Sequence, residues 1–299
     1  MPTLSDSFTL VINSSNVSNT NTNSIYTYNF IGGGIKIEDG MEAMISSAQI
    51  PYSINNITTA YNNNSFTLYF PTGSTSTSYT SFSIIIPDGF YTITDFNNYV
   101  QQFCITNGLY LINSSGQNVY YIAFYVNQST YSIQILLYTV PLSLPTGFTA
   151  PSNWIGYSTY SSVRTPYITL TANLTDYLGF TAGTYPPTAP ATPQTTNYSI
   201  LSNKKPPIAS YVNSIIIHCS LVNNACVSPS DILDAFQINN TSFGSNINYQ
   251  PTVEKYVKLS KGNYNSMVLY LTDQNNNPIV LLDPNILITI LFKKKNNLQ

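Results

Sequence analysis

The chain has 299 residues, a formal net charge of −2 and a charged fraction of only 7%. This length exceeds a single domain of roughly 100 to 150 residues, and the charged fraction lies far below the roughly 25% of ordinary soluble proteins. The net charge gives no electrostatic case for wrapping nucleic acid. We expect one large or two modest β-rich units with uncharged surfaces like interface cores. A coding bias of an A/T-rich genome is the alternative explanation.

The N-terminal stretch "MPTLSDSF" has neither the basic nor the apolar region of a signal peptide, and no apolar run reaches about 18 residues. We therefore expect synthesis in a cytosol-like compartment and no membrane span. Cys104, Cys219 and Cys226 are odd in number and lack CxxC spacing, which argues against a disulfide framework.

Strand-like alternation dominates the chain, beginning with "FTLVI", where Phe8, Leu10 and Ile12 share one face. Clusters of Asn, Gly, Pro and Ser with turn chemistry separate the strands. This pattern predicts an all-β sandwich or barrel and not a βαβ sheet. The further predicted strands are 25–30, 65–70, 81–87, 118–126, 131–140, 214–222, 265–271 and 285–292.

One convincing helix is predicted after the turn "PDG", over residues 95–104. Thr92 and Asp95 approximate a capping box, and the next apolar residues recur at helical spacing. We expect this helix to cover a sheet face that would otherwise be wet. Two weaker helical turns are predicted, at 228–231 before "ILDAF" and at 175–179.

The region 141–206 is rich in Pro, Gly, Thr and Ser, which favours an excursion or linker over core. Strong strand patterns resume only at Ser210. We therefore expect a discontinuous domain formed by residues 1–62 and 206–299, interrupted by an insertion domain formed by residues 63–205.

The residue types that could carry chemistry form no recognisable catalytic site. His218, the only histidine, lies beside Cys219 on a predicted strand, where neighbours point to opposite faces, and a pair with Cys104 has no supporting signature. We expect His218 to be an ordinary half-buried side chain. The sequence therefore predicts no catalytic residues and no enzyme activity.

No metal or cofactor site is predicted either. The stretch "DQNNNP" from Asp273 begins like a calcium loop, but Pro278 stands where glycine is needed and Pro284 replaces the acid, so a β-turn is expected. Gly32-Gly33-Gly34 lacks the Lys and Ser or Thr of a phosphate loop and is expected to be a flexible strand connection.

The basic run Lys293, Lys294 and Lys295 is expected to be a solvated strand end, with contact to a packaged genome or another acidic partner as the alternative. The 25 tyrosines lie among Asn and Thr instead of basic residues, which disfavours a single-strand nucleic-acid platform. Tyrosine stacking on sugars is an open alternative to core packing and interface contact.

Several stretches together resemble the penton, or minor capsid, proteins of virophages and Polinton-type viruses, most of all those of the Mavirus type. They are "IPYSINNIT" (50–58), "IPDGFYTITDFNNYV" (86–100), "YLGFTAGTYP" (177–186) and the most specific, "LTDQNNNPIVLLDPNILITILFKKK" (271–295). Residues 181–200 align with nothing in this family.

The resemblance implies a single jelly-roll β-sandwich with an inserted domain, present as a homopentamer at each vertex of an icosahedral virion among trimers of major capsid protein. It implies synthesis in the host cytoplasm and location at the capsid vertex. On this hypothesis, low charge lets neighbouring copies bury large faces without desolvating many ions. The alternative is a virion-surface protein that attaches to a host receptor or glycan through the insertion.

Overall fold

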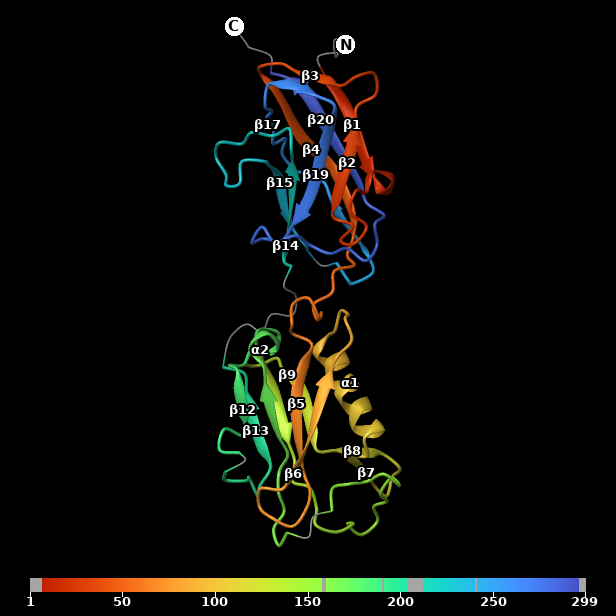
Figure 1. Cartoon of the computed structure of the whole chain (residues 1–299), viewed down its shortest axis with the longest axis vertical. Helices are drawn as coiled ribbons and strands as arrows, with labels where there is room; N and C mark the ends of the chain where they lie inside the picture. Colours follow the sequence, from red (N-terminus) through yellow and green to blue (C-terminus); the bar gives the residue numbers. More distant parts are fainter. Residues whose placement is uncertain (1–6, 158–159, 190, 204–211, 240, 296–299) are drawn as a thin grey trace. The chain divides into compact units, whose positions relative to one another are not determined.

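The computed structural model describes residues 7–157, 160–189, 191–203, 212–239 and 241–295. The chain divides into two compact units, a first formed up to Ile54 and from Val212 onward, and a second from Asn55 onward to residue 211 (Figure 1). Strands dominate the described part of both units, which has one 3-10 turn and two α-helices, so the predicted all-β class is confirmed. Among the described residues, no helix has the length and apolar character to cross a membrane.

The first unit is a jelly roll. One sheet has the order β1-β20-β4-β16, with β17 also pairing with β4, and the other has the order β15-β14-β19-β2. Counted along the chain, these eight main strands are in the order 1-8-3-6 and 2-7-4-5, which is the double Greek key of a jelly roll. The strands are β1 (Ser7–Asn13), β2 (Ile25–Asn29), β4 (Met41–Pro51), β14 (Ser214–Cys219), β15 (Ile232–Gln237), β16 (Asn246–Tyr249), β17 (Val257–Lys258), β19 (Ser266–Thr272) and β20 (Leu287–Lys294). A smaller pair joins β3 (Ile35–Ile37) to β18 (Gly262–Tyr264).

The jelly-roll core follows the alternation seen in the sequence. Leu10 and Ile12 of β1 lie opposite Ile290 and Ile288 of β20, and all four are buried. The eleven-residue strand β4 was not predicted, because its sequence "MEAMISSAQIP" does not alternate. The reason is a bulge in its pairing with β20, between Thr289 and Ile290, which shifts the faces midway.

The second unit is inserted between β4 and β14, the third and fourth strands of the jelly roll. Its sheets have the orders β12-β11-β5-β6 and β13-β10-β9, beside the hairpin β7-β8. A shared apolar core includes Phe66, Phe96 and Phe124, whose rings meet at centroid distances of 5.0 to 6.0 Å. The elements are β5 (Ser65–Pro71), β6 (Tyr79–Ile85), α1 (Ile93–Thr106), β7 (Tyr110–Ile112), β8 (Asn118–Tyr120), β9 (Ile122–Asn127), β10 (Ser132–Leu137), β11 (Tyr167–Leu170), α2 (Ala172–Leu178), β12 (Gly183–Tyr185) and β13 (Tyr198–Leu201).

Helix α1 confirms the predicted helix and its cap. The Thr92 hydroxyl accepts the backbone N–H of Asp95 at 3.2 Å, and the Asp95 carboxylate accepts that of Thr92 at 3.1 Å. The helix does more than cover a sheet face, because it contacts the free edges of two strands. Buried Asn97 accepts the N–H of Phe124 in β9 at 2.8 Å, and the Tyr99 hydroxyl donates to the carbonyl of Ile85 in β6 at 2.6 Å.

Two expectations for local structure are wrong. The segment 141–206 is not merely linker, because β11 and α2 place Ile168, Leu174 and Phe180 fully inside the core. No helical turn leads into "ILDAF", because Ile232–Gln237 is strand β15, paired with β14. Tertiary pairing overrides the local capping signal there. The weak turn at 175–179 lies in and just after helix α2, whose end is marked by Gly179 in the left-handed region.

Candidate functional site

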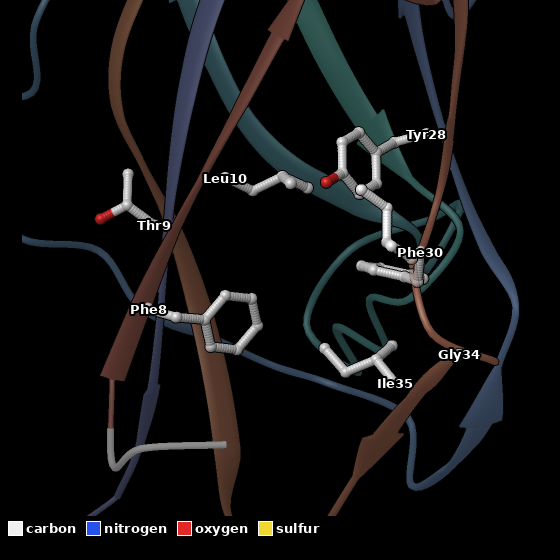
Figure 2. A pocket seen from close by; sticks show the side chains of 8 residues that line it. Phe8, Thr9, Leu10, Tyr28, Phe30, Gly34 and Ile35 are labelled. Atoms are coloured by element: carbon white, nitrogen blue, oxygen red, sulfur yellow. The ribbon is translucent and has the colours of Figure 1, made fainter. Parts of the chain in front are cut away.

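An apolar pocket lies in the jelly roll where strands β1 and β2 are the end strands of their respective sheets. Figure 2 shows Phe8 and Leu10 of β1 turned toward Tyr28 of β2 and Phe30, while Thr9 points the other way. Ile31 also lines the pocket and is 90% exposed, the highest value among the large apolar side chains. This pocket at β1 and β2 is called the flank pocket below.

Sequence and backbone geometry explain why the flank pocket is open. Among the described strands, β1 pairs with β20 and β2 with β19. The connection after β1 adds one bridge to β2, from Val17 to Tyr26, but no strand joins the two sheets beside Tyr28. The connection from β2 to β3 includes Gly34 at φ +107°, where a Cβ atom would lie 2.7 Å from the Tyr264 carbonyl oxygen. Only glycine fits that turn, and it leads directly to Ile35 on the pocket wall.

The chemistry of the flank pocket favours an apolar side chain over a metabolite. None of its lining residues is charged, and its volume is about 230 Å³. Pockets that hold drug-sized ligands are typically larger, roughly 300 to 1,000 Å³, with convergent polar groups. The flank pocket therefore suits a small apolar group better than a drug-sized ligand.

His218 belongs to a buried polar network that the sequence did not reveal. Its Nδ1 lies 3.0 Å from Asp231 Oδ1 and its Nε2 lies 2.8 Å from Thr272 Oγ1. Because a carboxylate only accepts, Nδ1 donates to Asp231 and Nε2 accepts from Thr272 while Asp231 is ionised and the ring neutral. The ring also stacks on Tyr270 at 4.3 Å, and the Tyr270 hydroxyl donates to Asp231.

This row of acid, imidazole and hydroxyl resembles a nucleophile with its base, but it is closed to substrate. His218 is 1% exposed, not half-buried as expected, and Thr272 is 2% exposed. Tyr270 and Thr272 are two residues apart on β19 and therefore share one face of the strand. This spacing is the sequence signal that could have placed them together. Asp231 had no signal, because it lies outside the strand alternation.

Neither buried cysteine is suited to nucleophilic chemistry. Cys104 lies in the core of the second unit and Cys219 in the jelly roll. Burial raises the pKa of each thiol to about 12, which suppresses the reactive thiolate. Cys226 is the exposed cysteine, in the loop between β14 and β15.

Each lysine of the basic run at the end of β20 lies near one acid. Lys293 Nζ lies 3.9 Å from Glu254 and 3.3 Å from the ring centroid of Tyr256. Lys294 pairs with Glu38 at 2.9 Å, and Lys295 lies 4.0 Å from Glu42. This geometry agrees with the solvated strand end that the sequence predicts.

The loop that begins like a calcium site is a turn held by its own carboxylate. Asp273 Oδ1 accepts the backbone N–H groups of Asn275 and Asn277, both at 2.8 Å. The carboxylate oxygens thus point at amides instead of a cation. Within the described residues, no cluster of three His, Cys, Asp or Glu side chains could hold a metal ion.

The second unit carries an aromatic pocket of about 360 Å³. Tyr120, Tyr138 and Phe148 line it together with the polar side chains of Thr139 and Asn197. Aromatic faces beside amide and hydroxyl groups suit a sugar ring. This pocket gives the glycan-binding alternative a location.

Comparisons with known proteins give no family model and no curated protein that matches. Among solved structures, the crystal structure of the mavirus penton protein is 12% identical, with 97% of this chain and 99% of that chain covered and a TM-score of 0.46. A chain in the cryo-EM structure of the Sputnik virophage is 15% identical, with 98% and 99% covered and a TM-score of 0.41. At these identities and scores, neither likeness carries an argument about function, and the jelly roll is assigned from the strand order of this chain.

Proposed function

We propose that this chain is a structural protein of a viral capsid, and that five copies close into a ring at a vertex of the icosahedral virion, in contact with major capsid protein. Jelly rolls recur in viral capsids and in lectins, so the fold alone does not choose between them. The resemblance of four sequence stretches to virophage penton proteins favours the capsid, and the ring number of five comes from that resemblance alone.

The observation that carries the proposal is the flank pocket. A closed ring needs a head-to-tail contact, in which one flank of each copy meets the opposite flank of the next. On the pocket side, the end strands of the two sheets are β1 and β2, and they contact each other. On the opposite side, the end strands are β15 in one sheet and, in the other, β16 and β17, which both pair with β4. In Figure 1, the turquoise loop between β14 and β15 projects on the β15 side, away from β1 and β2. That loop carries Cys226 and exposed Val227.

The low charge of the second unit suits it to contacts between neighbouring copies as well. Residues 55–203 contain only four charged side chains and no lysine: Asp88, Asp95, Arg164 and Asp176. Burying unpaired ions at an interface costs several kcal/mol each by usual estimates of desolvation. Each contact between copies should bury at least about 1,000 Å² in total to be stable.

Assembly of the purified full-length chain tests the proposal. We expect mass photometry and negative-stain microscopy, with and without major capsid protein, to show a discrete closed oligomer. Ile31→Asp places a charge in the flank pocket and is expected to abolish that oligomer while leaving the circular dichroism spectrum unchanged. Val126→Asp, at an apolar residue of the second unit that is 54% exposed, is the matched control. A chain that remains monomeric in the presence of major capsid protein would refute the capsid ring.

A covalent ladder tests the head-to-tail geometry. With Ile31→Cys at the pocket and native Cys226 on the opposite flank, mild oxidation of the oligomer should link each copy to the next. Non-reducing gels should then show a ladder of bands that ends at the ring number, and Cys226→Ser should remove it. A ladder requires the two cysteines to meet between different copies, which a two-fold symmetric dimer would limit to a single step. Oligomers without a ladder would place the ring contact elsewhere.

The second candidate function is attachment to a host glycan through the aromatic pocket of the second unit. Binding of the full-length chain to a glycan array, lost on Tyr138→Ala and retained on Ile31→Asp, would favour it over a purely structural role.

A further inference from the structure

Lysines gather at one end of the jelly roll, called the lysine end below. It comprises β3, the turn from β3 to β4, the segment from Glu254 to Lys261, and the end of β20. The β20 residue Lys293 lies near Glu254 and over Tyr256, and the backbone N–H of Lys295 donates to Gly40. The lysines are Lys36, Lys255, Lys258, Lys261, Lys293, Lys294 and Lys295.

The carboxylates at this end are fewer than the lysines. The lysine end has seven lysines and four acids, so its formal charge is +3. The acids are Glu38, Asp39, Glu42 and Glu254. In the rest of the described chain, Arg164 is the only cation against seven aspartates. The net charge of −2 therefore hides a strong separation of charge along the chain.

The ion pairs do not neutralise the lysine end. Glu38 is shared, lying 3.6 Å from Lys36 and 2.9 Å from Lys294, and the hydrogen bond from Lys294 lowers the pKa of its carboxyl group. Lys258 pairs with Asp39 at 3.5 Å. Within the described residues, no ion pair holds Lys255 or Lys261.

Among the described acids, Asp231 is connected to this end through the segment 219–223. The backbone N–H of Cys219 donates to the Asp231 carbonyl, and that of Asn223 donates to the Lys258 carbonyl. The Asp231 carboxylate is turned to His218 and Tyr270 and not to a lysine. Even with Asp231 counted, lysines outnumber acids at this end. The electrostatic screening length is about 10 Å at 0.1 M salt. A polyanion bound at this surface therefore interacts more strongly with the local excess of lysines than with aspartates farther away.

The arrangement of side chains selects a kind of polyanion. Lysine ammonium groups are point charges that suit phosphate oxygens. Single-stranded nucleic acid is held mainly by stacking on aromatic faces. Here the ring of Tyr256 is covered by Lys293, and the rings of Phe8 and Phe292, beside the end of β20, stack on each other with centroids 4.5 Å apart. We infer that the lysine end binds the phosphate backbone of double-stranded nucleic acid, without reading its sequence.

Binding of the full-length chain to a fluorescent random-sequence duplex, measured by anisotropy at several salt concentrations, tests this inference. With about three phosphates neutralised, log K should fall with log salt at a slope of about −3. Lys255→Gln with Lys261→Gln removes the two lysines without an ion pair and should reduce the slope by about 2. Unchanged circular dichroism shows that the variant is folded.

Removing an acid gives a change of opposite sign. Glu38→Gln raises the charge of the lysine end by one and should tighten duplex binding severalfold. Asp176→Asn changes the net charge of the chain equally but lies in the second unit, and should have no effect. Equal effects of the two variants would show that only net charge matters and would overturn a local site.

Two other outcomes also overturn the inference. One is the absence of salt-dependent duplex binding at low salt. The other is binding of polyglutamate without binding of the duplex, which would assign the surface to an acidic protein. Ring assembly is measured separately, so neither outcome bears on the proposed capsid role.

Discussion

Asp231 joins a buried histidine to the surface of the jelly roll. Burial by itself raises the pKa of Asp231, but hydrogen bonds from Tyr270 and His218 more than offset this, so its pKa lies below the ordinary value of 3.8. A carboxyl group with a lowered folded-state pKa stabilises the fold above its ordinary pKa, and this contribution is lost as pH falls through the folded-state value. The jelly roll should therefore lose stability on acidification below about pH 4.

Asp231→Asn tests this pH dependence. The amide keeps the shape but loses the charge, so we expect about 1 to 2 kcal/mol less stability at pH 7 and a flatter stability curve below pH 4. Tyr270→Phe removes one donor and should have a smaller effect in the same direction. Calorimetry between pH 2 and 7 measures both. An Asn variant with the wild-type pH profile would contradict the role given to the carboxylate.

Arg164 is a buried cation, 1% exposed, that binds a turn through backbone carbonyls. Its guanidinium donates to the carbonyl groups of Thr72, Thr75 and Ser78 at 2.7 to 2.8 Å, all in the connection from β5 to β6. Lysine keeps the charge but lacks the planar fork that reaches several acceptors together. Sequence alone gave no signal for this contact, because the donor and the turn are far apart along the chain.

Arg164→Lys should therefore destabilise the second unit by about 2 to 3 kcal/mol. Hydrogen exchange of the amides between residues 73 and 78 should accelerate in the variant. Ser76→Ala is a suitable control, because the Ser76 carbonyl, 3.2 Å from the guanidinium, remains in place. Unchanged exchange in the lysine variant would show that the turn is held by other contacts.

Helix α1 explains why an otherwise all-strand sequence contains one strong helix signal. β6 pairs only with β5, and β9 only with β10, so each has an open edge. Free edges invite pairing with other chains. Through Asn97 and Tyr99, α1 makes one side-chain hydrogen bond to the backbone of each of these edge strands.

Asn97→Ala should lower the free energy of unfolding by about 1 to 3 kcal/mol, because it leaves the N–H of Phe124 buried without its partner. Asn98 is exposed on the same helix, so Asn98→Ala is a matched control and should change stability by less than about 0.5 kcal/mol. Urea unfolding monitored by circular dichroism measures both. Equal losses would indicate an effect on the helix itself and not on the strand edge.

The elements that the sequence predicted are those whose signals are local. The box of Thr92 and Asp95 and the alternation in β1 depend on neighbours a few residues away, and both elements are confirmed. Elements that depend on distant pairing were missed. β4 forms through a bulged pairing with β20, which breaks the alternation in its sequence. The local sequence before β15 predicts a helical turn, but pairing with β14 makes β15 a strand.

The candidate sites follow the same division. Lys293, Lys294 and Lys295 were visible as a run. Lys36 joins them because it shares Glu38 with Lys294, and Lys258 joins them because β17 and β20 both pair with β4 at Glu42. The flank pocket was invisible in the sequence, since it results from two sheets whose end strands do not pair. Strand alternation predicts which residues face inward. It does not predict where the end strands of two packed sheets leave a pocket between them.

At the scale of the whole molecule, the ion pairs of Lys36, Lys258, Lys293, Lys294 and Lys295 all lie in the jelly roll. The second unit leaves the jelly roll after β4 and returns before β14, and it has a core of its own. The domain division into 1–62 with 206–299 and 63–205 stays a prediction until one part is shown to fold alone.

Residues 55–203, which span the described part of the second unit, test whether an inserted domain folds alone. Their core includes fully buried Phe66, Phe96, Val100 and Ile135, which is the kind of core that lets domains of 50 to 200 residues fold independently. We expect a cooperative thermal transition and a near-ultraviolet spectrum that shows fixed aromatic rings. Asn97→Ala should destabilise the segment as much as it does the full chain, since its partner Phe124 is included. The absence of a cooperative transition, or the absence of an effect of Asn97→Ala in the segment, would contradict this expectation. The second unit would then depend on the jelly roll for its fold and would not be an independent inserted domain.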